Sequence, residues 1–311
     1  MIHGVINIYK ERGFTSHDVV AKLRGIVKQK KIGHTGTLDP DAEGVLPVCL
    51  GKATKLCDML TDKDKTYETV LLLGRITDTQ DISGQTLEEH STESLTEEAV
   101  KEAILSFVGD YDQIPPMYSA LKVNGKKLYE LAREGKEVER KPRKVTIYQI
   151  TIKEIHLPRV RMEVKCSKGT YIRTLCHDIG LKLNCGGCME SLLRTQVERF
   201  EIKDSLKLSE VETHVKEHTL DELIVPIDKM FENLKAVTLT AEATRAVCNG
   251  NAFRQNDIVD IMPDTTGNTE FFESERIRVY GEAGNFIAIY VFQKDAEKFK
   301  IVRMFFDGRE Q

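Results

Sequence analysis

The order of the periodic segments constrains the fold of this chain more than any other feature. Over residues 1–232, strand-like segments at 3–10, 44–51, 65–74, 144–156 and 159–167 alternate with helical ones at 16–27, 53–60, 96–108 and 170–183. Ser16 is the expected N-cap of the first helix. After residue 233 a helix at 241–249 is followed by short alternating segments. This order predicts an α+β fold with a mixed β-sheet in a domain at 1–232, and a small, mostly β domain at 234–311.

Several classes of protein and site are disfavoured by the sequence. It has no apolar run of about 18 residues, and Met1 leads directly into a strand-like segment, so we expect a cytoplasmic protein without a membrane span. The seven cysteines are odd in number and scattered, which does not suggest a disulfide framework. Cys185 and Cys188 form one CxxC pair, which needs two further ligands to hold zinc. We therefore expect no metal.

The charge is unevenly distributed. The formal net charge of −4 argues against a polyanionic partner at first sight. However, basic residues outnumber acidic ones over 110–175, whereas acidic residues dominate 76–109 and 176–311. A modest net charge can therefore hide one positively charged face that binds nucleic acid.

Residues 30–44 (KKIGHTGTLDPDAEG) are the most informative stretch for function. They have no periodicity and contain three glycines and a proline, so they are predicted to form a loop. His34, Asp39, Asp41 and Glu43 lie within this loop, and polar loops on rigid scaffolds often carry chemistry. Two other interpretations stay open from composition alone: a simple turn at Asp39-Pro40, and a metal hydrolase site. The metal site is disfavoured because no second ligand cluster is found.

The segment GHTGTLDPDAEGVLPVCLG (33–51) resembles the catalytic motif of the TruB family of pseudouridine synthases, which modify uridine 55 of tRNA. The similarity continues in the same order over residues 10–20, 65–67, 113–135, 166–180 and 192–195. Colinear blocks are far more specific than one motif. The resemblance implies a pseudouridine synthase core with flanking helices, a thumb insertion at about 113–142, and a C-terminal PUA-like RNA-binding domain.

The resemblance also assigns the reaction. Asp39 matches the catalytic aspartate of the TLDP motif, which attacks the anomeric sugar carbon or removes a neighbouring sugar proton; sequence does not distinguish these routes. Because the base is only detached, rotated and rejoined to the sugar through carbon, no cofactor or metal is needed. Arg173 matches an arginine that pairs with this aspartate, and a guanidinium there favours the ionised carboxylate.

Four further residues match positions around the flipped base in the family. Tyr67 corresponds to the tyrosine that stacks on the extruded uracil, which recovers part of the lost base stacking. Tyr171 corresponds to a tyrosine that lines the pocket, and Leu192 to an apolar residue on the other side of the base. His34 corresponds to the histidine that fills the space left by the flipped nucleotide.

The expected partner is the T arm stem-loop of tRNA, bound through its phosphates. The thumb insertion is basic, and further lysines lie near the catalytic loop, among them Lys28. The predicted backbone contacts are Lys10, Lys30, Lys31, Lys122, Lys126, Lys127 and Arg133.

The sequence departs from the family pattern at a few positions: Glu11 replaces a proline, Leu193 an arginine, and Gly187-Cys188 the pair Ala-His. Two alternatives on the same scaffold are an RNA-guided synthase and a protein that assists tRNA folding. The full thumb favours a stand-alone enzyme, which we expect to be a monomer without an obligate protein partner. Intact Asp39, Tyr67 and Arg173 argue against loss of activity.

Overall fold

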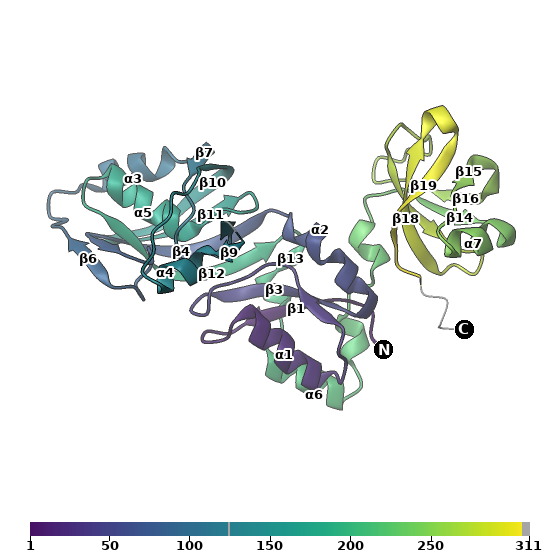
Figure 1. Ribbon diagram of the computed structural model, residues 1–311, viewed down its shortest axis with the longest axis horizontal. Coiled ribbons are helices and arrows are strands. Elements are labelled where there is room, and N and C mark those ends of the chain that lie inside the picture. The colour runs from purple at the N-terminus through teal and green to yellow at the C-terminus, as the bar shows by residue number, and fades with distance from the viewer. Residues whose placement is uncertain (124, 307–311) are drawn as a thin grey trace.

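The computed structural model describes residues 1–123 and 125–306, whose largest element is a mixed sheet. Its strand order is β1-β3-β12-β4-β11-β10-β7, with β13 added beside β12 and β2 beside β3 (Figure 1). Only the β3–β12 pair within it is parallel. The strands are β1 (Gly4–Lys10), β2 (Ile32–His34), β3 (Glu43–Leu50), β4 (Lys65–Leu73), β7 (Gly109–Gln113), β10 (Arg143–His156), β11 (Arg159–Cys166), β12 (Gly187–Val197) and β13 (Phe200–Glu201).

A second sheet of six strands is built from the C-terminal part of the chain. Its order is β15-β19-β18-β17-β14-β16, and Figure 1 shows it in green and yellow at the opposite end of the molecule from β6 and α3. The strands are β14 (Ala236–Leu239), β15 (Phe253–Arg254), β16 (Ile258–Met262), β17 (Arg276–Tyr280), β18 (Phe286–Gln293) and β19 (Lys298–Met304). Two small hairpins complete the strands: β5 (Arg75–Thr77) with β6 (Thr86–Glu89), and β8 (Lys122–Val123) with β9 (Lys126–Lys127).

Helices pack on both sheets. The helices are α1 (Ser16–Ile26), α2 (Cys57–Thr61), α3 (Glu97–Leu105), α4 (Leu128–Arg133), α5 (Ile172–Lys182), α6 (Leu208–Lys216) and α7 (Ala241–Cys248). Helices α1 and α6 contact each other, and α5 packs against β12 and β4. Helix α7 contributes Ala243 and Val247 to the core of the second sheet. No helix of the described residues is both long and apolar enough to cross a membrane.

The centre of the large sheet follows from the sequence of β4. Its first residues alternate in burial, and its last three, Leu71 to Leu73, are all buried. A strand with neighbours on both edges and helices on a face tolerates such an apolar run. Strand β4 is therefore a rigid scaffold between β12 and β11.

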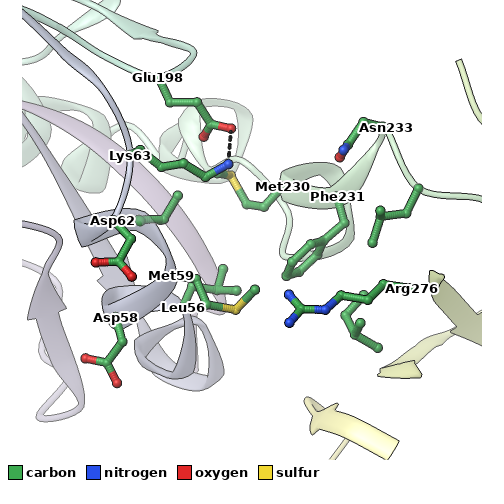
Figure 2. Close-up of a pocket in the computed structure, with 13 residues that line it drawn as sticks. Leu56, Asp58, Met59, Asp62, Lys63, Glu198, Met230, Phe231, Asn233 and Arg276 are labelled. Carbon is green, nitrogen blue, oxygen red and sulfur yellow. Dashed lines mark ion pairs between the residues drawn. The ribbon is translucent and has the colours of Figure 1, made fainter. Parts of the chain in front are cut away.

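The two sheets share one apolar cluster. It contains Val5 and Val45 from the large sheet, Phe231 from the connecting segment, and Ile289 and Phe305 from the C-terminal part. Lys55 also donates a hydrogen bond to the Met304 carbonyl at 2.7 Å. Beside this junction lies a pocket of about 470 Å³ (Figure 2), whose lining residues are Leu56, Asp58, Met59, Leu60, Asp62, Lys63, Glu198, Met230, Phe231, Asn233, Leu234, Arg276 and Ile289. None of these is a predicted site residue.

The mixed sheet with flanking helices confirms the predicted core architecture. Several details were predicted wrongly or not at all. The first helix is capped by Thr15, because its hydroxyl accepts from the Asp18 amide while Asp18 accepts from the Thr15 amide, so Ser16 is already helical. Strand β2 lies inside the predicted loop 30–44, and β12 was not predicted. The pair Asn124-Gly125 predicts a turn from its sequence, but residue 124 lies outside the described residues.

Candidate active site

The loop between β2 and β3 carries Asp39 and is held by side chains rather than by a sheet. The Ser16 hydroxyl accepts from the Leu38 amide at 3.0 Å. The Lys10 ammonium donates to the Pro40 carbonyl at 3.0 Å, and the same carbonyl accepts from the Gly13 amide. These contacts fix the backbone on both sides of Asp39, whose side chain keeps 45% of its surface exposed.

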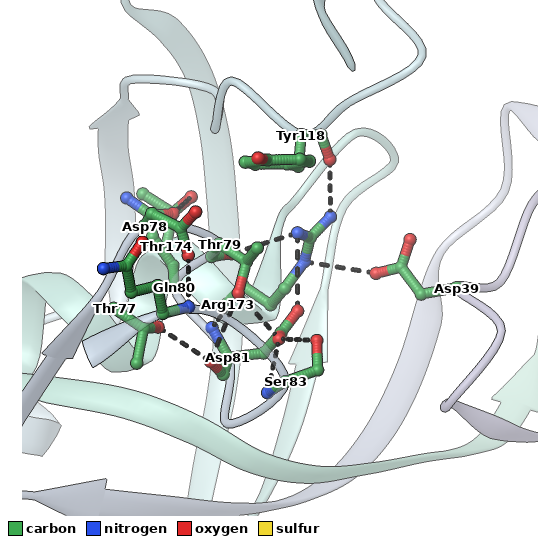
Figure 3. Close-up of polar contacts among 11 residues, drawn as sticks. Asp39, Thr77, Asp78, Thr79, Gln80, Asp81, Ser83, Tyr118, Arg173 and Thr174 are labelled. Atoms are coloured by element: carbon green, nitrogen blue, oxygen red, sulfur yellow. Dashed lines mark hydrogen bonds and ion pairs between the residues drawn. The ribbon is translucent and has the colours of Figure 1, made fainter. Parts of the chain in front are cut away.

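Asp39 faces Arg173, which projects from the first turn of α5. The Arg173 Nε lies 3.1 Å from the Asp39 Oδ2, and the arginine side chain is only 7% exposed (Figure 3). Arg173 also donates to the carbonyls of Thr79 at 3.1 Å and Tyr118 at 2.8 Å. The guanidinium fork is thus fixed in one orientation, with one edge presented to the carboxylate.

A second carboxylate contacts the same arginine. The Asp81 Oδ2 lies 3.6 Å from the Arg173 Nη1, and Asp81 is 17% exposed. Its other oxygen accepts from the Thr79 hydroxyl at 2.8 Å and the Ser83 amide at 3.0 Å, as Figure 3 shows. Sequence analysis missed Asp81. Its signal was the polar run DTQD at 78–81 between two short strands, which predicts a turn but no ion pair.

Tyr67 lies on β4 opposite Arg194 of β12. Both side chains are buried, and the guanidinium lies close enough to the phenol to influence its pKa. Burial raises the pKa of Tyr67, an effect that the charge of Arg194 reduces and that of Asp39 increases. Tyr67 therefore lies close enough to Asp39 for the charge of the carboxylate to affect the pKa of the phenol. Arg194 was also missed, because charged residues usually face solvent and the strand that buries this one was not predicted.

Tyr171 and Leu192 complete the surroundings of Asp39. The Tyr171 amide donates to the Gln113 side chain at 2.8 Å, and its carbonyl accepts from that side chain at 3.0 Å, which links α5 to the end of β7. Burial raises the pKa of Tyr171, and Asp39 adds to this effect. Leu192 packs against the cluster that contains Leu38 and Tyr67. The structure thus gathers Asp39, Arg173, Tyr67, Tyr171 and Leu192 around one site.

His34 ends β2 at the start of the catalytic loop. Its ring contacts that of His17 edge-on, with centroids 5.1 Å apart, and its Nδ1 accepts from the Gly36 amide at 3.4 Å. Burial lowers the pKa of His34, and the neighbouring His17 and Arg194 lower it further. A neutral imidazole is therefore favoured.

The other acidic residues of the loop lie elsewhere. Asp41 is exposed and pairs with Arg12 at 3.5 Å, and Glu43 accepts from the Tyr9 hydroxyl at 3.2 Å. Among the described residues, no group of three or more His, Cys, Asp or Glu side chains is arranged to hold a metal ion. The pair Cys185 and Cys188 consists of free, buried thiols.

The predicted phosphate contacts fall into two groups. Lys30, Lys31, Lys122, Lys126 and Arg133 are exposed and Lys127 is partly exposed. Lys126 pairs with Glu134 at 3.4 Å, and Lys127 and Arg133 lie over the Tyr129 ring. Lys10 differs, because it is fully buried and its ammonium is used to hold the Pro40 carbonyl. The expectation that Lys10 contacts a phosphate is therefore corrected: burial lowers its pKa to about 8 and removes it from the surface.

Comparisons with protein families agree with this arrangement. Residues 24–172 match the model described as "TruB family pseudouridylate synthase (N terminal domain)", and residues 173–232 match "tRNA pseudouridylate synthase B C-terminal domain". The first match covers Asp39, Tyr67 and Tyr171, and the second covers Arg173 and Leu192.

Individual relatives are similar over nearly their full length. A protein of Lachnoclostridium phytofermentans named tRNA pseudouridine synthase B is 52% identical over 98% of this chain and 100% of its own. A protein of Clostridium perfringens with the same name is 43% identical over 97% of this chain and 99% of its own.

Two solved structures have a similar fold. "Crystal Structure of a Cbf5-Nop10-Gar1 Complex" matches with a TM-score of 0.72 and 27% identity over 98% of this chain and 85% of the other. "Structure of H/ACA RNP bound to a substrate RNA containing 2'-deoxyuridine" matches with a TM-score of 0.72 over 99% of this chain and 86% of the other, but at 24% identity it shows the fold alone.

Proposed function

The chain belongs to the TruB family of pseudouridine synthases, and we propose that it isomerises uridine 55 in the T arm of tRNA to pseudouridine, with Asp39 as the catalytic carboxylate. The observation that carries the proposal is the half-exposed Asp39 carboxylate held 3.1 Å from the nearly buried Arg173. Such a carboxylate is open to a substrate on one side and oriented by a fixed guanidinium on the other.

The isomerisation balances without an added reactant. The bond between N1 of uracil and C1′ of ribose breaks, the base turns, and a bond forms between C5 and C1′. The proton on C5 then leaves, and a proton is added to N1. Asp39 serves this sequence either by attacking C1′ and leaving when C5 bonds to that carbon, or by removing the C2′ proton and returning it when the C5–C1′ bond forms. Both routes require the carboxylate to reach the ribose of a flipped nucleotide.

The surrounding side chains support the flipped base in this proposal. Tyr67 offers an aromatic face to the uracil, while Leu192 and Tyr171 close the other sides of the pocket. His34, whose neutral form is favoured, occupies the space that the nucleotide leaves. A neutral ring fits that place because it substitutes for an uncharged base.

The remaining parts of the chain bind the rest of the tRNA. We propose that the insertion 113–142 closes on the T arm through exposed cations such as Lys122 and Arg133. Residues 234–311 form a separate PUA-like module that contacts RNA. The enzyme acts in the cytoplasm as a monomer, without a protein partner, guide RNA, metal or cofactor.

The test compares wild type with Asp39→Asn on an unmodified tRNA transcript, using the purified protein alone. Release of tritium from C5 of uridine measures turnover, and chemical mapping locates the product. We expect conversion of one T-arm uridine by wild type, with or without a chelator, and no conversion by Asp39→Asn at unchanged tRNA affinity. Undiminished conversion by the folded Asp39→Asn variant contradicts the proposal. A requirement for added guide RNA indicates the RNA-guided alternative.

A further inference from the structure

Arg194 is the largest fully buried side chain among the described residues. It is 1% exposed, and within the described part of the chain no carboxylate lies within ion-pair distance of it. A buried charge without a counter-ion is unfavourable compared with an apolar side chain of similar length. Its polar contacts must therefore account for its place in the site.

The guanidinium of Arg194 holds the backbone on both sides of Asp39. Its Nε donates to the Val45 carbonyl at 2.7 Å, and its Nη2 donates to the Gly36 carbonyl at 3.4 Å. Gly36 precedes Asp39 and Val45 follows it, so one planar group joins both ends of the segment that carries the carboxylate. A lysine cannot reproduce this, because its ammonium is a single point on a flexible stem.

The same guanidinium contacts the phenol of Tyr67. The two residues are paired across β4 and β12, so their side chains lie on one face of the sheet. The phenol and the guanidinium lie close enough together for each to influence the pKa of the other, in addition to the effect of burial on both. Arg194 is therefore linked to the stacking platform and to the catalytic loop at once.

Two neighbouring cations are held in a similar way. Lys10 and Lys65 are also buried, and they donate to backbone carbonyls, Lys10 to that of Pro40 and Lys65 to that of Thr61. Besides burial, the charge of Arg194 lowers the pKa of both lysines, so these like charges oppose one another. These three buried cations therefore bind backbone carbonyls close to the site, and none of them pairs with a carboxylate at ion-pair distance among the described residues.

We propose that Arg194 is a positioning residue that fixes the separation between the Tyr67 ring and the Asp39 carboxylate by holding Tyr67 and both ends of the catalytic loop. This inference rests on the proposed function, since it states how the Tyr67 ring is aligned with the uracil while the Asp39 carboxylate is aligned with the ribose of the same nucleotide. Misplacement of a reacting group by about 1 Å costs roughly 100-fold in rate. Substituting Arg194 should therefore lower the rate constant of the chemical step and leave the affinity for tRNA nearly unchanged.

The experiment uses Arg194→Lys, Tyr67→Phe and the double variant in single-turnover assays with saturating tRNA. We expect Arg194→Lys to lower the rate constant by roughly 30- to 100-fold, with less than about a threefold change in Kd. Because both residues act through one link, the double variant should be slower than the slower single variant by less than about threefold. Multiplicative losses, or a rate for Arg194→Lys within about twofold of wild type, overturn the inference.

A second measurement does not depend on activity or on a change at Arg194. Amide hydrogen exchange of residues 35–42 should be faster by about tenfold in Tyr67→Phe, because the guanidinium loses its polar neighbour on β4. Unchanged exchange overturns the link even if Arg194→Lys fails to fold.

The matched control is Lys235→Met, which also removes a fully buried cation but lies at the start of the second sheet. In the same single-turnover assay with saturating tRNA, it should destabilise the protein without slowing the chemical step; equal slowing shows that lost stability alone explains the Arg194 effect and overturns the proposal. If wild type produces no pseudouridine, the proposed function fails, whereas the exchange result still decides the link.

Discussion

Removing the negative charge of Asp81 is the sharpest test of the arginine that holds Asp39. The variant Asp81→Asn keeps the shape of the side chain and an oxygen that can accept from Thr79 and Ser83. What it loses is the charge 3.6 Å from the Arg173 Nη1. The guanidinium then has no second carboxylate opposing the pull of Asp39.

The size of the effect follows from the burial of the pair. At this separation and an effective dielectric constant of about 20, the Coulomb attraction is roughly 4–5 kcal/mol. Most of this lost attraction is offset in two ways. The neutral amide of Asp81→Asn does not carry the desolvation cost of a buried carboxylate, and Arg173 keeps Asp39 and two backbone carbonyls as partners. We expect about 1–2 kcal/mol to remain, which corresponds to a roughly 5- to 30-fold slower chemical step if it appears in the transition state.

The assay is single-turnover tritium release, accompanied by urea unfolding. Asp78→Asn is the matched control, because Asp78 lies in the same turn but accepts from the Gln85 amide at 2.7 Å, whereas the ion pairs of Arg173 among the described residues are those to Asp39 and Asp81. The control should retain the wild-type rate. A rate for Asp81→Asn within about twofold of the control, with both proteins folded, refutes the argument that Asp81 orients the guanidinium.

Three further predictions concern His34 and the thumb. The pKa of His34 in the folded protein lies below its usual 6.5. Its contribution to the free energy of unfolding is therefore present above pH 6.5 and is lost as the pH falls through the lowered pKa. In urea unfolding between pH 7 and 5, His34→Gln should lose less of its free energy of unfolding than wild type does. The same variant should slow turnover less than Asp39→Asn does, and equal losses would contradict a space-filling role. Exposed Lys122, replaced by alanine, should weaken tRNA binding and reduce the slope of log K against log salt by about one, whereas Lys216→Ala on α6 should leave both unchanged.

The periodic elements were predictable because their local signals agree with their environment. Strand β4 carries a long apolar run and lies in the middle of the sheet, and α3 begins after Thr96, whose hydroxyl accepts from the Ala99 amide. Strand β12 gives no such signal. It starts with Gly187-Cys188, contains two irregularities in its pairing with β4, and buries Arg194, so its residues do not alternate in polarity. Its position is set by its neighbours rather than by its own sequence.

The candidate site was predictable only where a motif carried it. Asp39 and Arg173 lie far apart in sequence, and only the resemblance brought them together before the structure did. Asp81 was missed because its role depends on a contact with α5 across the fold. Thr15, in contrast, could have been identified as the helix cap, since Asp18 follows it at the spacing of a capping box.

The lysines and arginines illustrate why composition alone cannot locate this site. Lys10 and Lys30 are chemically identical, yet Lys10 is buried under the catalytic loop and Lys30 is exposed. A buried cation acts on the backbone and side chains beside it through short hydrogen bonds, which salt barely screens, whereas an exposed cation acts on phosphates through a field that salt screens strongly. Substituting the buried group should therefore change the rate of chemistry at any ionic strength, and substituting the exposed group should change affinity mainly at low salt. Salt dependence thus separates the cations that build the site from those that bring tRNA to it, a distinction that a net charge of −4 conceals.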